Sequence, residues 1–159
     1  MGIDVERYEE FHGIKLLSGP DTHPGSGPPA AHEKEYKRFL EAINELNPEK
    51  QSPVMLELGA YWGLWSLVFR QRFPKGSNIL IEYGSHQLAV GVRNFQLNDY
   101  DADFIHGGIF LEESGTASRA SDDIEFAKGG ILGQQGPELD LLSLFNDRQN
   151  LDLIHADIQ

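Results

Sequence analysis

The sequence of 159 residues contains no cysteine, which excludes a disulfide framework, a thiolate metal site and a cysteine nucleophile. It contains no apolar run near the ~18 residues of a membrane span, and the stretch Met1–Gly13 has no apolar signal core. Basic residues are few, with 13 Lys and Arg scattered among 25 Asp and Glu. The resulting net charge of −12 repels nucleic acid and anionic membranes. We therefore expect a soluble, cytoplasmic protein that binds neither.

Two common catalytic motifs are also missing. The P-loop pattern G-x-x-x-x-G-K-[ST] does not occur, which argues against a nucleoside triphosphatase. The pattern G-x-S-x-G is absent too, and Ser66 has no evident His and Asp partners, so hydrolase chemistry is disfavoured. The composition itself, 40% hydrophobic and 24% charged, is that of a globular domain with one core.

The chain divides into an N-terminal arm and a domain. Residues 1–31 show little periodicity, and the Gly-, Pro- and Ser-rich segment Ser18–Ala30 predicts either a flexible leader or a lid over a cofactor loop. Residues 32–159 carry regular apolar patterns and form the predicted domain. Its first helix, His32–Leu46, places Tyr36, Phe39, Leu40, Ile43 and Leu46 on one face.

The remaining elements alternate between short apolar runs and amphipathic stretches. The pattern predicts strands from Val54 and over Asn78–Glu82, Ala102–His106 and Leu151–Ile158, with helices from Leu64 and over Gln87–Asn98 and Glu138–Phe145. In the helix over Gln87–Asn98 we expect Leu88, Val92, Phe95 and Leu97 to face inward. The glycine-rich stretch 109–135 interrupts the alternation and favours a β-hairpin excursion.

This order predicts an α/β fold, a Rossmann-like doubly wound parallel sheet with strand order 3-2-1-4. Such a sheet is incomplete after its fourth strand, because Leu151–Ile158 would lie at an apolar edge with no neighbour on one side. We expect that edge to be covered by a further C-terminal segment or by self-association.

The stretch Val54–Ser66 is the centre of the functional prediction. A buried strand turns through the loop Gly59–Gly63 into a helix, which points backbone amides and a positive helix end at one place above the sheet. The next strand ends in Glu82, placed to accept hydrogen bonds from a ribose diol, and the fourth ends in Asp157. Both NAD and S-adenosylmethionine carry such a diol. A pyrophosphate favours glycine where Tyr61 stands, so the loop favours S-adenosylmethionine.

Three stretches resemble the FkbM-like family of class I S-adenosylmethionine-dependent methyltransferases. Glu57–Ser66 is similar to its first motif, Ile81–Tyr83 with Val90–Asn98 to its second block, and Asp152–Gln159 to its strand-four motif. The resemblance spans residues 53–159 and implies O-methylation of a small molecule or of a glycan hydroxyl.

The resemblance also implies roles for individual residues. Glu57 and the backbone of Gly59, Ala60, Tyr61, Trp62 and Gly63 would hold the amino-acid end of the cofactor. Glu82 would bind the ribose, and Tyr83, His106 and Gly107 would flank the adenine. Asp157 would face the methyl group as a general base, a metal ligand or an electrostatic partner of the sulfonium.

Several alternatives remain open from the residues alone. The same fold could serve a nicotinamide oxidoreductase, or a non-catalytic methyltransferase-like binding module. The pair His155 and Asp157 could share an ion on one strand face, although packing of His155 is the expectation, and we predict no metal site. Asn94 and Asn98 share a helix face and would either tie that helix to a strand or contact a ligand.

Overall fold

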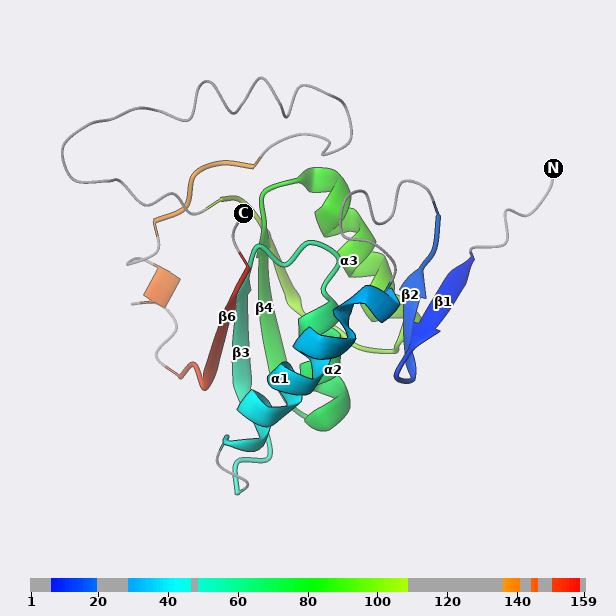
Figure 1. The fold of residues 1–159 in the computed structure, drawn as a ribbon. Coiled ribbons are helices and arrows are strands. Elements are labelled where there is room, and N and C mark those ends of the chain that lie inside the picture. Colours follow the sequence, from blue (N-terminus) through cyan, green and yellow to red (C-terminus); the bar gives the residue numbers. More distant parts are fainter. Residues whose placement is uncertain are drawn as a thin grey trace.

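A computed structural model describes residues 7–19, 29–46, 49–108, 136–140, 144–145 and 150–157. It contains a four-stranded parallel sheet, a two-stranded hairpin and helices packed between them (Figure 1). The strands are β1 (Tyr8–Phe11), β2 (Ile14–Leu17), β3 (Val54–Leu58), β4 (Ser77–Glu82), β5 (Asp103–His106) and β6 (Leu153–Ala156). The helices are η1 (Pro29–His32), α1 (Glu33–Asn44), α2 (Leu64–Arg72) and α3 (Ser85–Leu97).

The strand order of the sheet is β5-β4-β3-β6, with every pair parallel, which confirms the predicted 3-2-1-4 arrangement. The central strand β3 is apolar because both of its faces are covered, as parallel strands require. The outer strand β6 pairs with β3 and with no other described strand. Its Ile154 is 49% exposed, as expected for a strand at an edge.

Two apolar layers cover the two faces of the sheet. On one face, side chains of β3 and β4 pack with the three α-helices and the hairpin, so these elements stand together on that side in Figure 1. On the other face, Leu56, Leu58, Ile79 and Ile81 form a cluster that Leu139, Leu144, Phe145 and Leu151 cover. None of the helices in the described ranges is long and apolar enough to cross a membrane.

The hairpin β1–β2 lies within the range 1–31, where the sequence pattern predicts only an arm or lid. Phe11, Ile14 and Leu16 are buried in the same cluster as the helices. The turn at His12 and Gly13 has φ of +50° and +83°, the two positive values of a tight hairpin turn. The apolar–polar alternation after that turn was the available signal, but a strand of four residues is too short to stand out. Most of Ser18–Ala30 lies outside the described residues.

Two further expectations need correction. Helix α3 buries Gln87, Val90, Gly91, Asn94 and Phe95, whereas Leu88, Val92 and Leu97 are only half-buried. The reason is that β2 packs against α3, which turns the covered face toward Asn94.

The predicted helix over 138–145 is not helical at its start. Glu138 forms an extended bridge with Gly108, which draws the chain alongside the end of β5, and helical geometry is found at residues 144–145. The predicted excursion over 109–135 lies outside the described residues, as does Ile158.

Candidate cofactor site

The carboxyl ends of the four strands bring the predicted site residues to one edge of the sheet, where ligands bind in doubly wound folds. Hydrogen bonds between successive strand ends hold this edge together. The amide of Gly107 donates to the carbonyl of Glu82 at 3.0 Å, and the amide of Asp157 donates to the carbonyl of Leu58 at 3.0 Å. The strand ends therefore form one continuous rim.

The loop between β3 and α2 folds over the end of β4. The amides of Gly59 and Ala60 both donate to the carbonyl of Ile81, at 3.0 and 2.9 Å. Three of its residues, Gly59, Tyr61 and Gly63, have positive φ values of 71°, 50° and 76°. Glycine takes this conformation freely, but for Tyr61 it is unfavourable and must be held by neighbours.

Glu82 supplies that restraint. One of its carboxylate oxygens accepts the amide of Tyr61 at 2.7 Å, and the other accepts the amide of Gly84 at 2.8 Å. The residue is 9% exposed. Each carboxylate oxygen can accept a second hydrogen bond, so a ribose diol remains a chemically suitable partner.

Glu57 supports the start of α2. It is 1% exposed, and one of its oxygens accepts bonds from both the amide (3.1 Å) and the hydroxyl of Ser66 in the first turn of α2. A carboxylate at this place caps the helix and opposes its positive end. Through these bonds Glu57 supports the loop from beneath, and its predicted contact with the amino-acid end of a cofactor stays a prediction.

His155 is packed as expected. Its ring contacts Phe39 and Trp65 edge-on or tilted, and its Nδ1 lies 3.6 Å from the second oxygen of Glu57. Within the described part of the chain, no three His, Asp or Glu side chains gather as a metal site would need. Asp157, which follows β6, is exposed at the rim.

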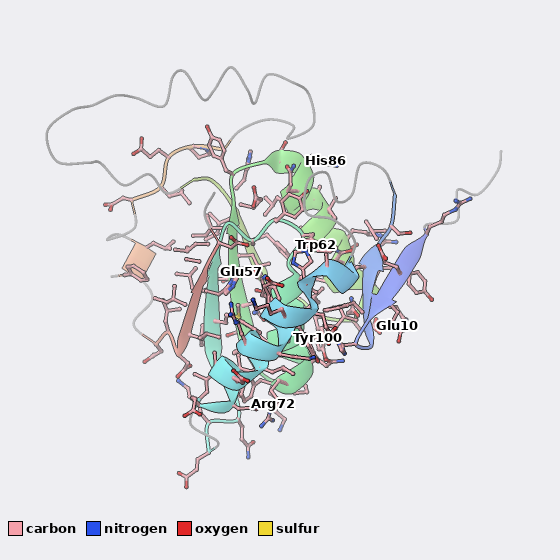
Figure 2. All side chains as sticks on the ribbon, in the orientation of Figure 1. Glu10, Glu57, Trp62, Arg72, His86 and Tyr100 are labelled. Carbon is pink, nitrogen blue, oxygen red and sulfur yellow. The ribbon has the colours of Figure 1, made fainter. Side chains whose placement is uncertain are left out.

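Trp62 contributes backbone to the loop, while its side chain belongs to the core. The indole is buried with Trp65 and the residues of α1, and the carbonyl accepts a bond from Asn94 at 3.0 Å. Glu57 and Trp62, labelled in Figure 2, both lie between the sheet and the helices. Of the two roles that the sequence allows for Asn94, the structure shows the structural one, because its side chain connects α3 to β2 and to the loop.

On the predicted adenine side, Tyr83, His106 and Gly107 contact other parts of the chain. His106 approaches the carbonyl of Tyr83 with its Nε2 at 3.1 Å, which connects the ends of β4 and β5. Over Gly107 lies Leu139, close enough that a Cβ on this glycine would stand 2.6 Å from its side chain. Residues 136–139 therefore border this end of the rim, a contact that no local pattern indicates.

A cavity of about 470 Å³ lies at the opposite edge of the sheet. Its lining comes from the starts of the four strands and from the end of α2, including Val54, Arg70, Ser77, Asp103 and Leu151. The loops that follow the strands are not part of it. Ligands of doubly wound folds bind beyond the carboxyl ends of the strands, so this cavity is not the candidate cofactor site.

No protein-family model matches the sequence, and no curated protein matches it either. Solved structures match in fold. PH0793 of Pyrococcus horikoshii, provisionally named a transferase, gives a TM-score of 0.50 at 20% identity over 67% of this chain and 38% of its own. The P. horikoshii protein TYW2, in complex with MeSAdo, gives 0.45 at 19% identity over 68% and 38%. A SAM-dependent methyltransferase from Agrobacterium tumefaciens gives 0.47 at 12% identity over 68% and 34%.

The fold is α/β with a Rossmann-like parallel sheet. The strand order β5-β4-β3-β6 and the likeness to PH0793 confirm this predicted class. At these identities the likeness concerns the fold alone, and this chain spans less than two fifths of the length of the three structures.

Proposed function

We propose that the chain forms the cofactor-binding part of an S-adenosylmethionine-dependent methyltransferase, of the FkbM-like type that its motifs resemble. The observation that carries this proposal is the charge of the loop region. Glu57 places a carboxylate at the first turn of α2, and Glu82 places another against the amide of Tyr61.

This arrangement discriminates between the two cofactors that carry a ribose diol. A helix start ordinarily favours an anion, because its amides are free and its dipole end is positive. Here Glu57 already takes the amide of Ser66, and Glu82 takes the amide of Tyr61. The pyrophosphate of NAD would meet two carboxylates. S-adenosylmethionine has a sulfonium and an ammonium group, which the same carboxylates attract.

Three parts of the site would each have a role in binding the cofactor or in transferring its methyl group. Glu82 would accept hydrogen bonds from the ribose, and the backbone of Gly59–Gly63 would border the amino-acid end of the cofactor. When bound, S-adenosylmethionine supplies an electrophilic methyl group. Asp157, exposed at the end of β6, would accept the proton that an acceptor hydroxyl releases, or would oppose the positive sulfonium. A small molecule or a glycan as acceptor rests on the motif resemblance.

Isothermal titration calorimetry with S-adenosylhomocysteine tests the proposal. The wild-type chain should bind it, and Glu82→Gln should weaken binding about tenfold or more, because hydrogen bonds to a charged acceptor are worth roughly 1.5–3 kcal/mol. Asp103→Asn is the matched control, since it removes the same charge at the other end of the sheet. Binding of NADH in place of S-adenosylhomocysteine would overturn the proposal.

The two other functions predict different results when binding of both cofactors and methyl transfer are measured. A nicotinamide oxidoreductase would give NADH fluorescence changes that S-adenosylhomocysteine does not reverse. A non-catalytic module would bind S-adenosylhomocysteine or fail to bind it, and would transfer no labelled methyl group from S-adenosylmethionine to any hydroxyl acceptor.

A further inference from the structure

Asn94 of α3 and Asn98, the C-cap residue of that helix, hydrogen-bond to the backbone of β2 much as a neighbouring strand would. The amide of Lys15 donates to Oδ1 of Asn98 at 2.9 Å, and Nδ2 of Asn98 donates to the carbonyl of Lys15 at 2.7 Å. The amide of Leu17 donates to Oδ1 of Asn94 at 2.8 Å. Four helical residues rise about 6 Å and two strand residues about 6.8 Å, so the two spacings match.

Asn94 makes one contact that Asn98 does not. Its Nδ2 donates to the carbonyl of Trp62, inside the loop between β3 and α2, and the residue is fully buried. The orientation of its amide group follows from the partners, because Leu17 offers a donor and Trp62 an acceptor. The second donor bond of Asn98 goes to the carbonyl of Asn94, at 2.7 Å.

The Trp62 carbonyl is a sensitive point of the loop. It belongs to the same planar peptide unit as the amide of Gly63, so fixing the oxygen also aims that amide. The Gly63 amide donates to the carbonyl of Ala60 at 2.7 Å and closes the turn that precedes α2. Gly63 has a positive φ, as has Tyr61 two residues earlier, so this peptide unit leads directly into a left-handed residue. Asn94 is the side chain that holds it from the helix side.

We propose that Asn94 is a positioning residue that couples the N-terminal hairpin to the cofactor loop. Its one amide group binds both, and the hairpin residue is 77 positions away in the sequence. The part that concerns the ligand rests on the proposed function. Since coupling between two sites is reciprocal, a ligand that orders the loop also stabilises the contact of the hairpin, and loss of the contact weakens the ligand.

The variants Asn94→Asp and Asn98→Asp separate this role from general stability. Asn94→Asp keeps an oxygen for the Leu17 amide but replaces the donor to Trp62 by a second acceptor. Amide hydrogen exchange of the ligand-free protein, corrected for global stability by urea unfolding, should speed up about tenfold at Gly63 and little at Leu17; tenfold corresponds to about 1.4 kcal/mol. Asn98→Asp should leave Gly63 unchanged.

Equal acceleration at Gly63 in both variants, or none in Asn94→Asp, would overturn the proposal. If the buried aspartate prevents folding, Asn94→Ser removes both hydrogen bonds without adding a charge, and it should speed up amide exchange at Gly63 and Leu17 together. If the Leu17 amide stays protected from exchange in Asn94→Ser while the Gly63 amide does not, the coupling is contradicted.

Titration with S-adenosylhomocysteine adds the ligand arm. In the wild type, bound S-adenosylhomocysteine should slow hydrogen exchange at the Leu17 amide. In Asn94→Asp this slowing should disappear, and the dissociation constant of S-adenosylhomocysteine should rise about tenfold. If the wild-type protein does not bind S-adenosylhomocysteine, the proposed function fails, whereas the ligand-free exchange pattern still decides whether Asn94 holds the loop. Binding that leaves Leu17 unaffected would refute the coupling and spare the function.

Discussion

Gly63→Ala probes the conformation on which the loop depends. Gly63 precedes the first residue of α2 with φ of 76°, in the left-handed region, where an L-residue costs about 1–2 kcal/mol. A Cβ there would also stand 3.1 Å from the ring of Phe95 and 3.2 Å from Leu80. Both neighbours are fully buried, so relief requires movement of the core, which costs about 1–3 kcal/mol.

The two costs together predict a loss of about 2–5 kcal/mol in the free energy of unfolding. For a protein of this size that corresponds to a fall of roughly 4–20 °C in melting temperature. Urea unfolding followed by circular dichroism measures it, with an unchanged slope showing that the unfolded state is unaffected. Affinity for S-adenosylhomocysteine should fall as well, because the same residue opens the helix at the loop.

Gly91→Ala is the matched control, since it makes the same chemical change inside α3. The nearest atom to its added Cβ is the Tyr61 carbonyl oxygen at 3.4 Å, and the position is helical. Alanine is better than glycine in a helix interior by about 0.5–1 kcal/mol, so this variant should be as stable as the wild type or more stable. If Gly63→Ala stays within 0.5 kcal/mol of the wild type, the left-handed assignment of the loop is wrong.

Three further predictions concern single side chains in and around the sheet. Glu57→Gln removes the charge from the acceptor of the two donors in the first turn of α2, and should lower the free energy of unfolding by about 1–2 kcal/mol in thermal melts. Asp152→Asn weakens the bond to the amide of Val54 that joins the starts of β6 and β3, and urea titration should show a loss of about 1 kcal/mol. Burial raises the pKa of Tyr36 above its ordinary value of 10.0, and the charge of Glu33 raises it further. The folded protein therefore keeps this proton longer than the unfolded chain, so stability should fall as pH rises above 10.0, and Tyr36→Phe should flatten that fall in unfolding measured across this range.

The site at the rim combines strain with support from both sides of the loop. Tyr61 is held in an unfavourable conformation by Glu82 on the sheet, and the peptide unit between Trp62 and Gly63 is held by Asn94 on α3. Strained residues persist where their surroundings determine them several times over. Under the proposed function, a loop built in this way would already be ordered before the ligand arrives, which would reduce the ordering cost of binding.

The sequence by itself determined the class of the fold and the place of the candidate site. Apolar runs alternating with amphipathic stretches require a parallel sheet, and local rules then put the loop Gly59–Gly63, Glu82 and Asp157 at the ends of three strands. These features depend on the spacing of apolar residues along the chain, which can be read directly from the sequence. The predicted strand order 3-2-1-4 is confirmed for the same reason.

The tertiary structure alone decided how the site residues are used. Whether Glu57 faces a ligand or the start of α2 depends on the position of Ser66, and the burial of Asn94 depends on a hairpin 77 residues earlier. The placement of Leu139 over Gly107 likewise needs the fold. Such contacts join residues that are distant in sequence, and they are selected by packing and by the need to pair buried polar groups, neither of which leaves a periodic trace.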